Sequence, residues 1–219
     1  MTIAILRPLR LIVARVGPLA ALMTWRPELR RTELIVCLLA LSAWMIVELR
    51  SEHEAANRAA ERSPDDRGSR YAVLGAHLTS WWLPFIEISV APTPVFVSRA
   101  IAGVAIVAAG AALRLIAVRT LGEYFTAHVR VVDGQPVCRS GIYALVRHPS
   151  YAGLLLLNLG PSVAAGTWIS LGIAMVLTMA SNRVRVEIEE RALTARLGAG
   201  YVDYCRTVPR WVPRAWGAE

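Results

Sequence analysis

The chain has 219 residues, of which 55% are hydrophobic, and its mean hydropathy of +0.45 is too high for an ordinary soluble domain. The formal net charge is +8, and all 24 basic residues are Arg because the sequence contains no Lys. This composition predicts a membrane protein and excludes both a Schiff-base Lys and a phosphate-binding loop that ends in Lys.

The N-terminal segment, residues 1–25, mixes apolar residues with positive charge. Arg7, Arg10 and Arg15 interrupt the apolar run, and no clean small-residue cleavage site follows. A cleaved signal peptide is therefore not expected. We expect instead a helix that lies at the membrane interface or is partly inserted.

Three segments of the N-terminal half approach the length of a membrane-spanning helix, which needs about 20 apolar residues. They are residues 33–49, 71–90 and 98–118. The third is rich in small residues, which favour close packing of helices. Residues 50–70 carry charges of both signs and predict a solvated loop.

The apolar segment 151–180 is too long for one spanning helix. Gly160 and Pro161 in its middle predict a turn between two short helices. A hairpin begins and ends on one side of the membrane, so the polar blocks 119–150 and 181–219 should share a face. Their Arg residues predict the cytoplasmic face and favour anionic lipid over nucleic acid as the partner.

These elements predict an all-α, polytopic integral membrane protein with about five transmembrane helices and a C-terminal helical hairpin. Residues 1–118 form the N-terminal membrane helices, and residues 119–219 form a second region that ends in an amphipathic helix. Orientation of the N-terminal crossings stays open, because Arg-rich segments flank the first span on both sides. Cys37, Cys138 and Cys205 lie far apart with no C-x-x-C pair, so neither a disulfide framework nor a metal site is expected.

Polar side chains gather where the segment 151–180 begins. The stretch GIYALVRHPSYAG contains Tyr143, Arg147, His148 and Tyr151. Each has an ordinary interfacial alternative, since Arg extends toward headgroups, Tyr joins aromatic belts and His caps helices.

A second polar helix is predicted from about residue 180 to 197, ending near Gly198. Arg185 and Glu189 share one of its faces, because they are four residues apart. The alternative is a solvated helix with surface ion pairs. The predicted hairpin, however, returns this helix to the mouth where Arg147 and His148 lie.

These motifs together resemble the isoprenylcysteine carboxyl methyltransferases and their bacterial relatives, which share a C-terminal region with phospholipid N-methyltransferases. The resemblance covers residues 121–213, about half of the chain. Its motifs occur in order: Gly-x-Tyr, Arg-His-Pro-x-Tyr-x-Gly, Glu-Glu, Gly-x-x-Tyr-x-x-Tyr and Val-Pro-x-x-x-Pro.

The resemblance implies S-adenosyl-L-methionine as the cofactor, bound in a pocket that faces the cytosol. The implied cofactor contacts are Gln135, Pro136, Val137, Cys138, Tyr143, His148, Pro149, Ser150, Tyr151 and Glu189. Family members often have His and Leu where this chain has Gln135 and Pro136, so contacts there are expected from the backbone. A carboxylate such as Glu189 suits the ammonium group of the cofactor.

The resemblance places Arg185 on the acceptor side. An acceptor carboxylate is ionised at neutral pH and needs no general base, so positioning dominates, and the planar fork of Arg185 suits it. Arg147 is the second choice. An amine acceptor would need a base, for which Glu190 or Tyr151 would have to serve.

The implied acceptor is a lipid-like or prenylated molecule that enters from the membrane, and the oligomeric state stays open. A chain whose basic residues are all Arg indicates a GC-rich genome and a bacterial inner membrane. The alternatives are a phospholipid or other amine or thiol methyltransferase, an NADPH-dependent enzyme like the sterol reductases, which have a related Arg-His-Pro segment, and a non-enzymatic membrane scaffold.

Overall fold

The computed structural model describes residues 68–213 apart from 95, 126–128, 130 and 132–133, together with five isolated positions between 32 and 42. The predicted N-terminal helix, and almost all of the span 33–49 and the loop 50–70, lie outside the described residues. The elements are α3 Ser69–Val90, α4 Val97–Leu121, η3 Gly122–Tyr124, η4 Gly141–Ala144, α5 Pro149–Ala165, α6 Trp168–Leu197 and α7 Ala199–Thr207. All regular structure in this part of the chain is helical, as predicted.

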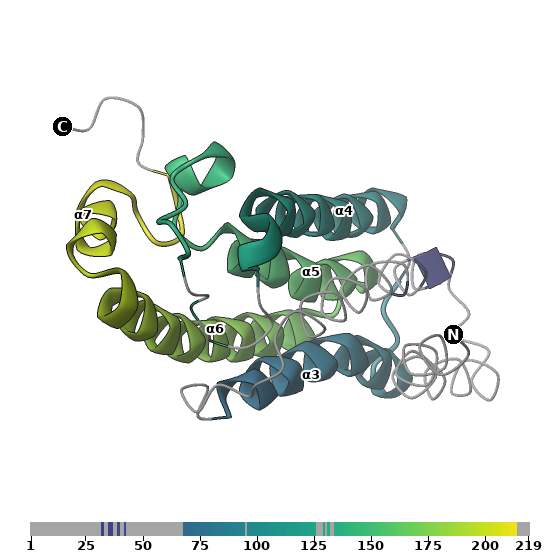
Figure 1. The fold of residues 1–219 in the computed structure, drawn as a ribbon. Helices are drawn as coiled ribbons and strands as arrows, with labels where there is room; N and C mark the ends of the chain where they lie inside the picture. The colour runs from purple at the N-terminus through teal and green to yellow at the C-terminus, as the bar shows by residue number, and fades with distance from the viewer. Residues whose placement is uncertain are drawn as a thin grey trace, which may run out of the picture.

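Helix α5 is the central element of the described fold. It packs against α4, α6 and α3, and α3 also packs along α6 (Figure 1). Most residues of α5 are buried, including Leu157 and Asn158, which have no exposed surface. The first turn of α5, which carries the Arg-His-Pro motif, is therefore anchored by three neighbouring helices.

Glycines bring α4 and α5 into close contact. A Cβ atom on Gly103 would lie 2.3 Å from the backbone nitrogen of Ala164, and one on Gly110 would lie 2.7 Å from the carbonyl oxygen of Gly153. Only glycine allows backbones to approach so closely, which is the packing that small residues permit between membrane helices. The abundance of small residues in the segment 98–118 thus correctly indicated close packing.

The predicted turn at Gly160 and Pro161 is wrong. Helix α5 continues through both residues to Ala165, and the chain turns at Gly166, where φ is 71°. Gly160 serves packing instead, because a Cβ atom there would lie 2.4 Å from Cγ2 of Val107. The left-handed conformation of Gly166 closes the helix end, and its N–H donates to the carbonyl groups of Ser162 and Val163.

Helix α6 then runs back antiparallel to α5. Near the turn, the Asn158 side-chain amide donates to Thr178 Oγ1 at 2.9 Å; farther along, Asn182 donates to the Tyr151 carbonyl at 3.2 Å. Helix α6 is continuous over 30 residues, about 45 Å at 1.5 Å per residue. The second arm of the expected hairpin and the expected polar helix 180–197 are thus one helix, whose predicted end at Leu197 is confirmed.

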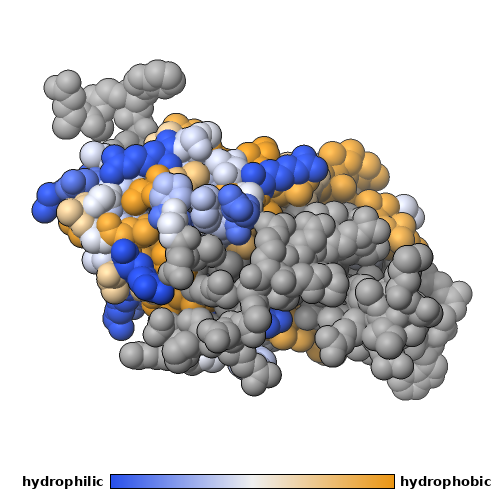
Figure 2. Space-filling view, in the orientation of Figure 1, coloured by the Kyte–Doolittle hydropathy of each residue, from blue (hydrophilic) through white to orange (hydrophobic). Residues whose placement is uncertain are grey.

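Apolar and polar surface lie at different ends of the described fold. By length and composition, one described segment, Val97–Tyr124, could cross a membrane, with a mean hydropathy of 2.3 and 22% of its apolar window buried. Figure 2 shows hydrophilic residues concentrated at the end that holds α7, and hydrophobic surface over the opposite part. Five crossings and a membrane-spanning hairpin stay predictions.

Close packing at Gly103 makes a testable prediction about stability. Gly103→Ala should destabilise the protein by about 1–3 kcal/mol, because the new methyl group overlaps the α5 backbone. The matched control is Gly172→Ala in α6, where a Cβ atom would have no neighbour within 4 Å. Thermal unfolding in detergent compares the two variants, and an equal shift for both would contradict this account of the packing.

Candidate functional site

The candidate site forms where the first turn of α5 meets the last turns of α6. The Arg-His-Pro segment also pairs with the C-terminal tail, since the Arg147 N–H donates to the Pro209 carbonyl at 2.9 Å and the His148 N–H donates to the Arg210 carbonyl at 3.2 Å. These bonds hold together segments about 60 residues apart in sequence. The end of the bundle that holds α7 carries the site (Figure 1).

Glu190 of α6 is the centre of a charged cluster that contacts both the Arg-His-Pro segment and the C-terminal tail. Its carboxylate accepts from His148 Nε2 at 3.0 Å and from Arg210 Nε at 3.0 Å, and it forms an ion pair with Arg147 Nη2 at 3.2 Å. Arg147 also donates to the Cys205 carbonyl at 2.7 Å. One carboxylate therefore joins α6, the Arg-His-Pro segment and the tail.

The charge state of Glu190 follows from these partners. Burial opposes ionisation, but hydrogen bonds from His148 and Arg210 and the charge of Arg147 outweigh it and lower the Glu190 pKa to about 2. A carboxylate held this firmly is a weak general base. The suggestion that Glu190 acts as a base toward an amine acceptor is therefore not supported by its surroundings.

Glu189, one residue earlier, has a different environment. The Tyr151 hydroxyl donates to Glu189 Oε2 at 2.8 Å, and the same hydroxyl accepts from Arg185 Nε at 3.3 Å. Arg185 and Glu189 share a face of α6 as predicted, with the Tyr151 hydroxyl between them. This arrangement places a carboxylate, a phenol and a guanidinium in sequence along one side of the helix.

An aromatic side chain from the tail lies against these groups. The ring of Trp211 lies 6.0 Å from that of His148 and 6.5 Å from that of Tyr151, measured between centroids. The aromatic ring therefore borders the polar and charged groups of the site.

Tyr143 connects this cluster to the strip that precedes it. Its carbonyl accepts from the Tyr204 hydroxyl of α7 at 2.6 Å. Burial raises the Tyr143 pKa, and the nearby charges of Glu189 and Cys138 raise it further. Tyr143 therefore remains a neutral phenol and lies near both Glu189 and the strip.

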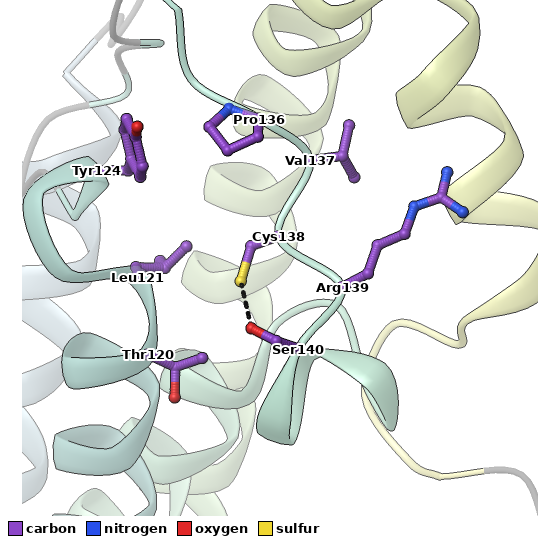
Figure 3. Close-up of a pocket in the computed structure, with 8 residues that line it drawn as sticks. All are labelled: Thr120, Leu121, Tyr124, Pro136, Val137, Cys138, Arg139 and Ser140. Carbon is purple, nitrogen blue, oxygen red and sulfur yellow. Dashed lines mark hydrogen bonds between the residues drawn. The ribbon is translucent and has the colours of Figure 1, made fainter.

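The strip itself borders a cavity of about 520 Å³ (Figure 3). Pro136, Val137 and Cys138 line it together with Thr120, Leu121, Tyr124, Arg139 and Ser140. In Figure 3 the side chains of Leu121, Pro136 and Cys138 face a shared space, whereas Arg139 points away. Arg139 instead donates to the Gly200 carbonyl at 2.8 Å, which fixes the strip to α7.

The structure brings together most of the residues implied by the motifs. Arg147 and His148 lie in the cluster around Glu190. Tyr151, Arg185 and Glu189 form a second hydrogen-bonded group, and the rings of His148 and Tyr151 lie 5.9 Å apart. Pro149 and Ser150 are buried in the first turn of α5. Gln135 belongs to the extended strip but is not among the residues that line the cavity. Their roles as cofactor contacts belong to the proposal made below.

Sequence reasoning missed several residues of this region. Arg114 of α4 donates to Ser150 Oγ at 2.7 Å, and a lone Arg inside an apolar segment is a signal that could have found it. Arg210 and Trp211 lie inside the last motif, but their partners could not be inferred. Ser69, which accepts from Arg185 at 2.9 Å, gave no signal because it lies 116 residues away. Among the described residues, no group of three or more His, Cys, Asp or Glu could hold a metal ion.

Part of the chain that carries the site is similar to a known protein family. Residues 103–195 match the model of the Isoprenylcysteine carboxyl methyltransferase (ICMT) family. This segment is similar to the ICMT family. It contains α5, almost all of α6, His148 and the hydrogen-bonded group of Tyr151, Arg185 and Glu189.

Individual relatives agree with the ICMT match. Protein-S-isoprenylcysteine O-methyltransferase B of Arabidopsis thaliana is 31% identical over 113 residues, which are 51% of this chain and 57% of the relative. The Rattus norvegicus Protein-S-isoprenylcysteine O-methyltransferase is 36% identical over 121 residues, 54% of this chain and 42% of the relative. The chain thus spans about half the length of the curated relatives it matches.

A solved structure extends the likeness in fold. The eukaryotic intramembrane Ras methyltransferase ICMT superposes with a TM-score of 0.62 at 22% identity, covering 85% of this chain and 70% of that one. At this identity the comparison supports the fold alone. It reaches beyond the matched family segment.

The state of Glu190 predicts how stability depends on pH. Its pKa falls from the usual 4.5 to about 2 on folding, so its stabilising contribution is complete above pH 4.5 and is lost as pH falls toward 2. Glu190→Gln should lower the thermal unfolding midpoint at neutral pH and flatten its decline between these pH values. The control is Glu187→Gln, because Glu187 lies on the same helix and pairs with the exposed Arg183. Parallel pH profiles for wild type and Glu190→Gln would contradict this role.

Proposed function

We propose that this protein is an integral-membrane methyltransferase that uses S-adenosyl-L-methionine and transfers methyl to a carboxylate of a lipid-like or prenylated acceptor. The observation that carries the proposal is the sequence of Arg185, Tyr151 and Glu189 in one network within the ICMT segment. Glu189 is suited to the cofactor and Arg185 to the acceptor, and the Tyr151 hydroxyl forms a hydrogen bond with both.

The cofactor side fits the chemistry of S-adenosyl-L-methionine. Glu189 presents a carboxylate suited to the ammonium group, and Tyr151 holds that carboxylate in place. The cavity beside the strip 135–140 is lined by apolar side chains such as Leu121 and Pro136 and by polar ones such as Ser140, a mixture that suits an adenine ring (Figure 3). When bound, the cofactor supplies an electrophilic methyl group attached to sulfur.

The acceptor side is assigned to Arg185. Its guanidinium is buried, with 5% of its surface exposed, and a planar fork in a sheltered position can bind a carboxylate with two hydrogen bonds. Holding an already ionised acceptor in line with the methyl group contributes several kcal/mol to barrier lowering. Arg147, the second choice, forms an ion pair with Glu190 and donates to the Cys205 carbonyl.

The surroundings favour a carboxylate acceptor over an amine. An amine must lose a proton, and Glu190 is occupied by cations that lower its pKa to about 2. The Tyr151 hydroxyl already donates to Glu189. A carboxylate acceptor is already ionised, so its methylation requires neither Glu190 nor Tyr151 to act as a base.

The membrane location explains how two unlike substrates meet. Exposed apolar side chains on α4 and α6, such as Ile101, Trp168 and Val176, suit contact with lipid tails. The polar end of the fold holds the site and, by the Arg bias, faces the cytoplasm. A lipid-linked acceptor then reaches the site from the bilayer while the cofactor arrives from water.

The test is to incubate membranes that contain the protein with methyl-labelled S-adenosyl-L-methionine, extract the lipids and identify the labelled product. We expect a base-labile methyl ester that is absent from membranes lacking the protein. A labelled amine or thioether would replace the proposed acceptor class. Thermal stabilisation by NADPH, with none by S-adenosyl-L-methionine, would favour a reductase instead, and the absence of both label and stabilisation would favour a scaffold.

Glu189→Ala should weaken cofactor binding, because the ammonium group loses its charged partner. A hydrogen bond to a charged group is worth roughly 1.5–3 kcal/mol, so the dissociation constant should rise about tenfold to a hundredfold. Calorimetric titration of the folded variant measures it. Glu187→Ala on the exposed face of α6 is the control and should bind normally; an unchanged affinity in Glu189→Ala would return Glu189 to a structural role.

Arg185→Lys should keep the charge but lose the two-pronged geometry. Turnover should fall at least about tenfold while cofactor affinity barely changes. Arg183→Lys is the matched control, since Arg183 lies on the same helix in an exposed pair with Glu187 and such pairs contribute about 0–1 kcal/mol. Full activity in Arg185→Lys would remove Arg185 from the mechanism.

A further inference from the structure

Ser69 lies against the guanidinium of Arg185, although the two residues are 116 positions apart. Arg185 Nη1 donates to Ser69 Oγ at 2.9 Å, and both side chains are buried, with 4% of Ser69 and 5% of Arg185 exposed. A hydrogen bond to a charged group in a buried setting is stronger than one at the surface. The contact therefore restricts the orientation of the guanidinium.

The local backbone presents Ser69 at this point. Gly68 adopts a left-handed conformation with φ of 75°, its carbonyl accepts from the Tyr71 N–H, and α3 begins at Ser69. Helix α3 then packs along α6. The Gly68 turn and the packing of α3 along α6 therefore hold the Ser69 hydroxyl beside Arg185.

The other serines of α3 behave differently. Ser80 Oγ donates to the Ala76 carbonyl and Ser89 Oγ donates to the Phe85 carbonyl, both at 2.7 Å and both four residues back in the same helix. Ser69 is the first residue of the helix, so no helical carbonyl lies four residues before it. Its hydroxyl accepts instead from Arg185 of α6.

Two hydroxyl groups from different helices therefore contact the Arg185 guanidinium. Tyr151 of α5 accepts from Nε at 3.3 Å, and Ser69 of α3 accepts from Nη1 at 2.9 Å. A planar fork with contacts on two of its nitrogens has a defined plane as well as a defined position. That plane decides which acceptor geometry the fork can match.

We infer that Ser69 is a positioning residue for Arg185, and that α3, which lies outside the matched family segment 103–195, helps to set the geometry of the acceptor side. The inference rests on the proposed function, because it takes Arg185 as the group that orients the acceptor. Ser69 acts through Arg185 and does not itself contact the reactants. Loss of its hydroxyl should then affect turnover and leave the cofactor side unchanged.

The experiment measures turnover, using the labelled acceptor identified above, beside cofactor affinity by calorimetry. Ser69→Ala should lower kcat about tenfold, the effect of losing one charge-assisted hydrogen bond, with an unchanged cofactor dissociation constant. Ser69→Thr, which keeps the hydroxyl, should restore most of the activity. Ser80→Ala is the matched control, since this buried serine of the same helix bonds only within α3, and it should be as active as wild type.

A double-variant cycle with Arg185→Lys separates positioning from general stabilisation. Ser69→Ala should lower kcat in the wild-type background and cause no further loss in the Arg185→Lys background, because both changes remove the same orientation. Equal losses in both backgrounds, or a loss of cofactor affinity that matches the loss of kcat, would overturn the inference. If Ser69→Ala does not fold, Ser69→Cys decides, because its thiol is nearly the same size but a weak acceptor: lowered kcat supports the inference and full activity overturns it.

The same experiment tests the proposed function and the role of Ser69 separately. Wild-type membranes that transfer no methyl group from S-adenosyl-L-methionine would refute the proposed function itself. Transfer by wild type that is equally fast in Ser69→Ala would leave the proposed function intact and refute only the role of Ser69.

Discussion

The ionised carboxylate of Glu190 is the interaction on which the polar end of this fold depends. It accepts hydrogen bonds from His148, the residue just before α5, and from Arg210 in the tail, and it forms an ion pair with Arg147. Helix α5 packs against three other helices. The Glu190 contacts add a connection between the segment before α5, helix α6 and the tail, so they hold the polar end of the fold together. Without this anion the buried guanidinium of Arg147 would lose its charged partner, which is costly for a buried cation.

Adjacent carboxylates on α6 have contrasting surroundings. Glu190 is surrounded by cations, whereas Glu189 receives a hydrogen bond from the neutral phenol of Tyr151. Consecutive residues on a helix point about 100° apart, so a Glu-Glu pair can contact two different environments at once. One carboxylate organises the scaffold, and its neighbour remains suited to a cationic ligand.

Motif spacing correctly predicted that Arg185 and Glu189 share a face of α6. It also placed the Arg-His-Pro segment directly before a long apolar run. The turn at Gly160 was misplaced, since glycine serves equally for a turn and for close contact, and only the partner Val107 distinguishes them. Ser69 could not be foreseen, as nothing local relates it to Arg185. Long-range contacts across helices are the part of the site that pattern and propensity do not encode.

The unequal lengths of α5 and α6 have a consequence for how a membrane-borne molecule is handled. Helix α5 has 17 residues and α6 has 30, about 26 Å and 45 Å at 1.5 Å per residue, beside a hydrocarbon layer about 30 Å thick. If the protein spans the membrane as proposed, the first turn of α5 lies at the depth of the lipid headgroups. The C-terminal, charged turns of α6 then extend beyond it into water. A lipid could then be modified without being lifted out of its leaflet, so the energetic penalty of extracting an acyl or isoprenoid tail never enters the reaction.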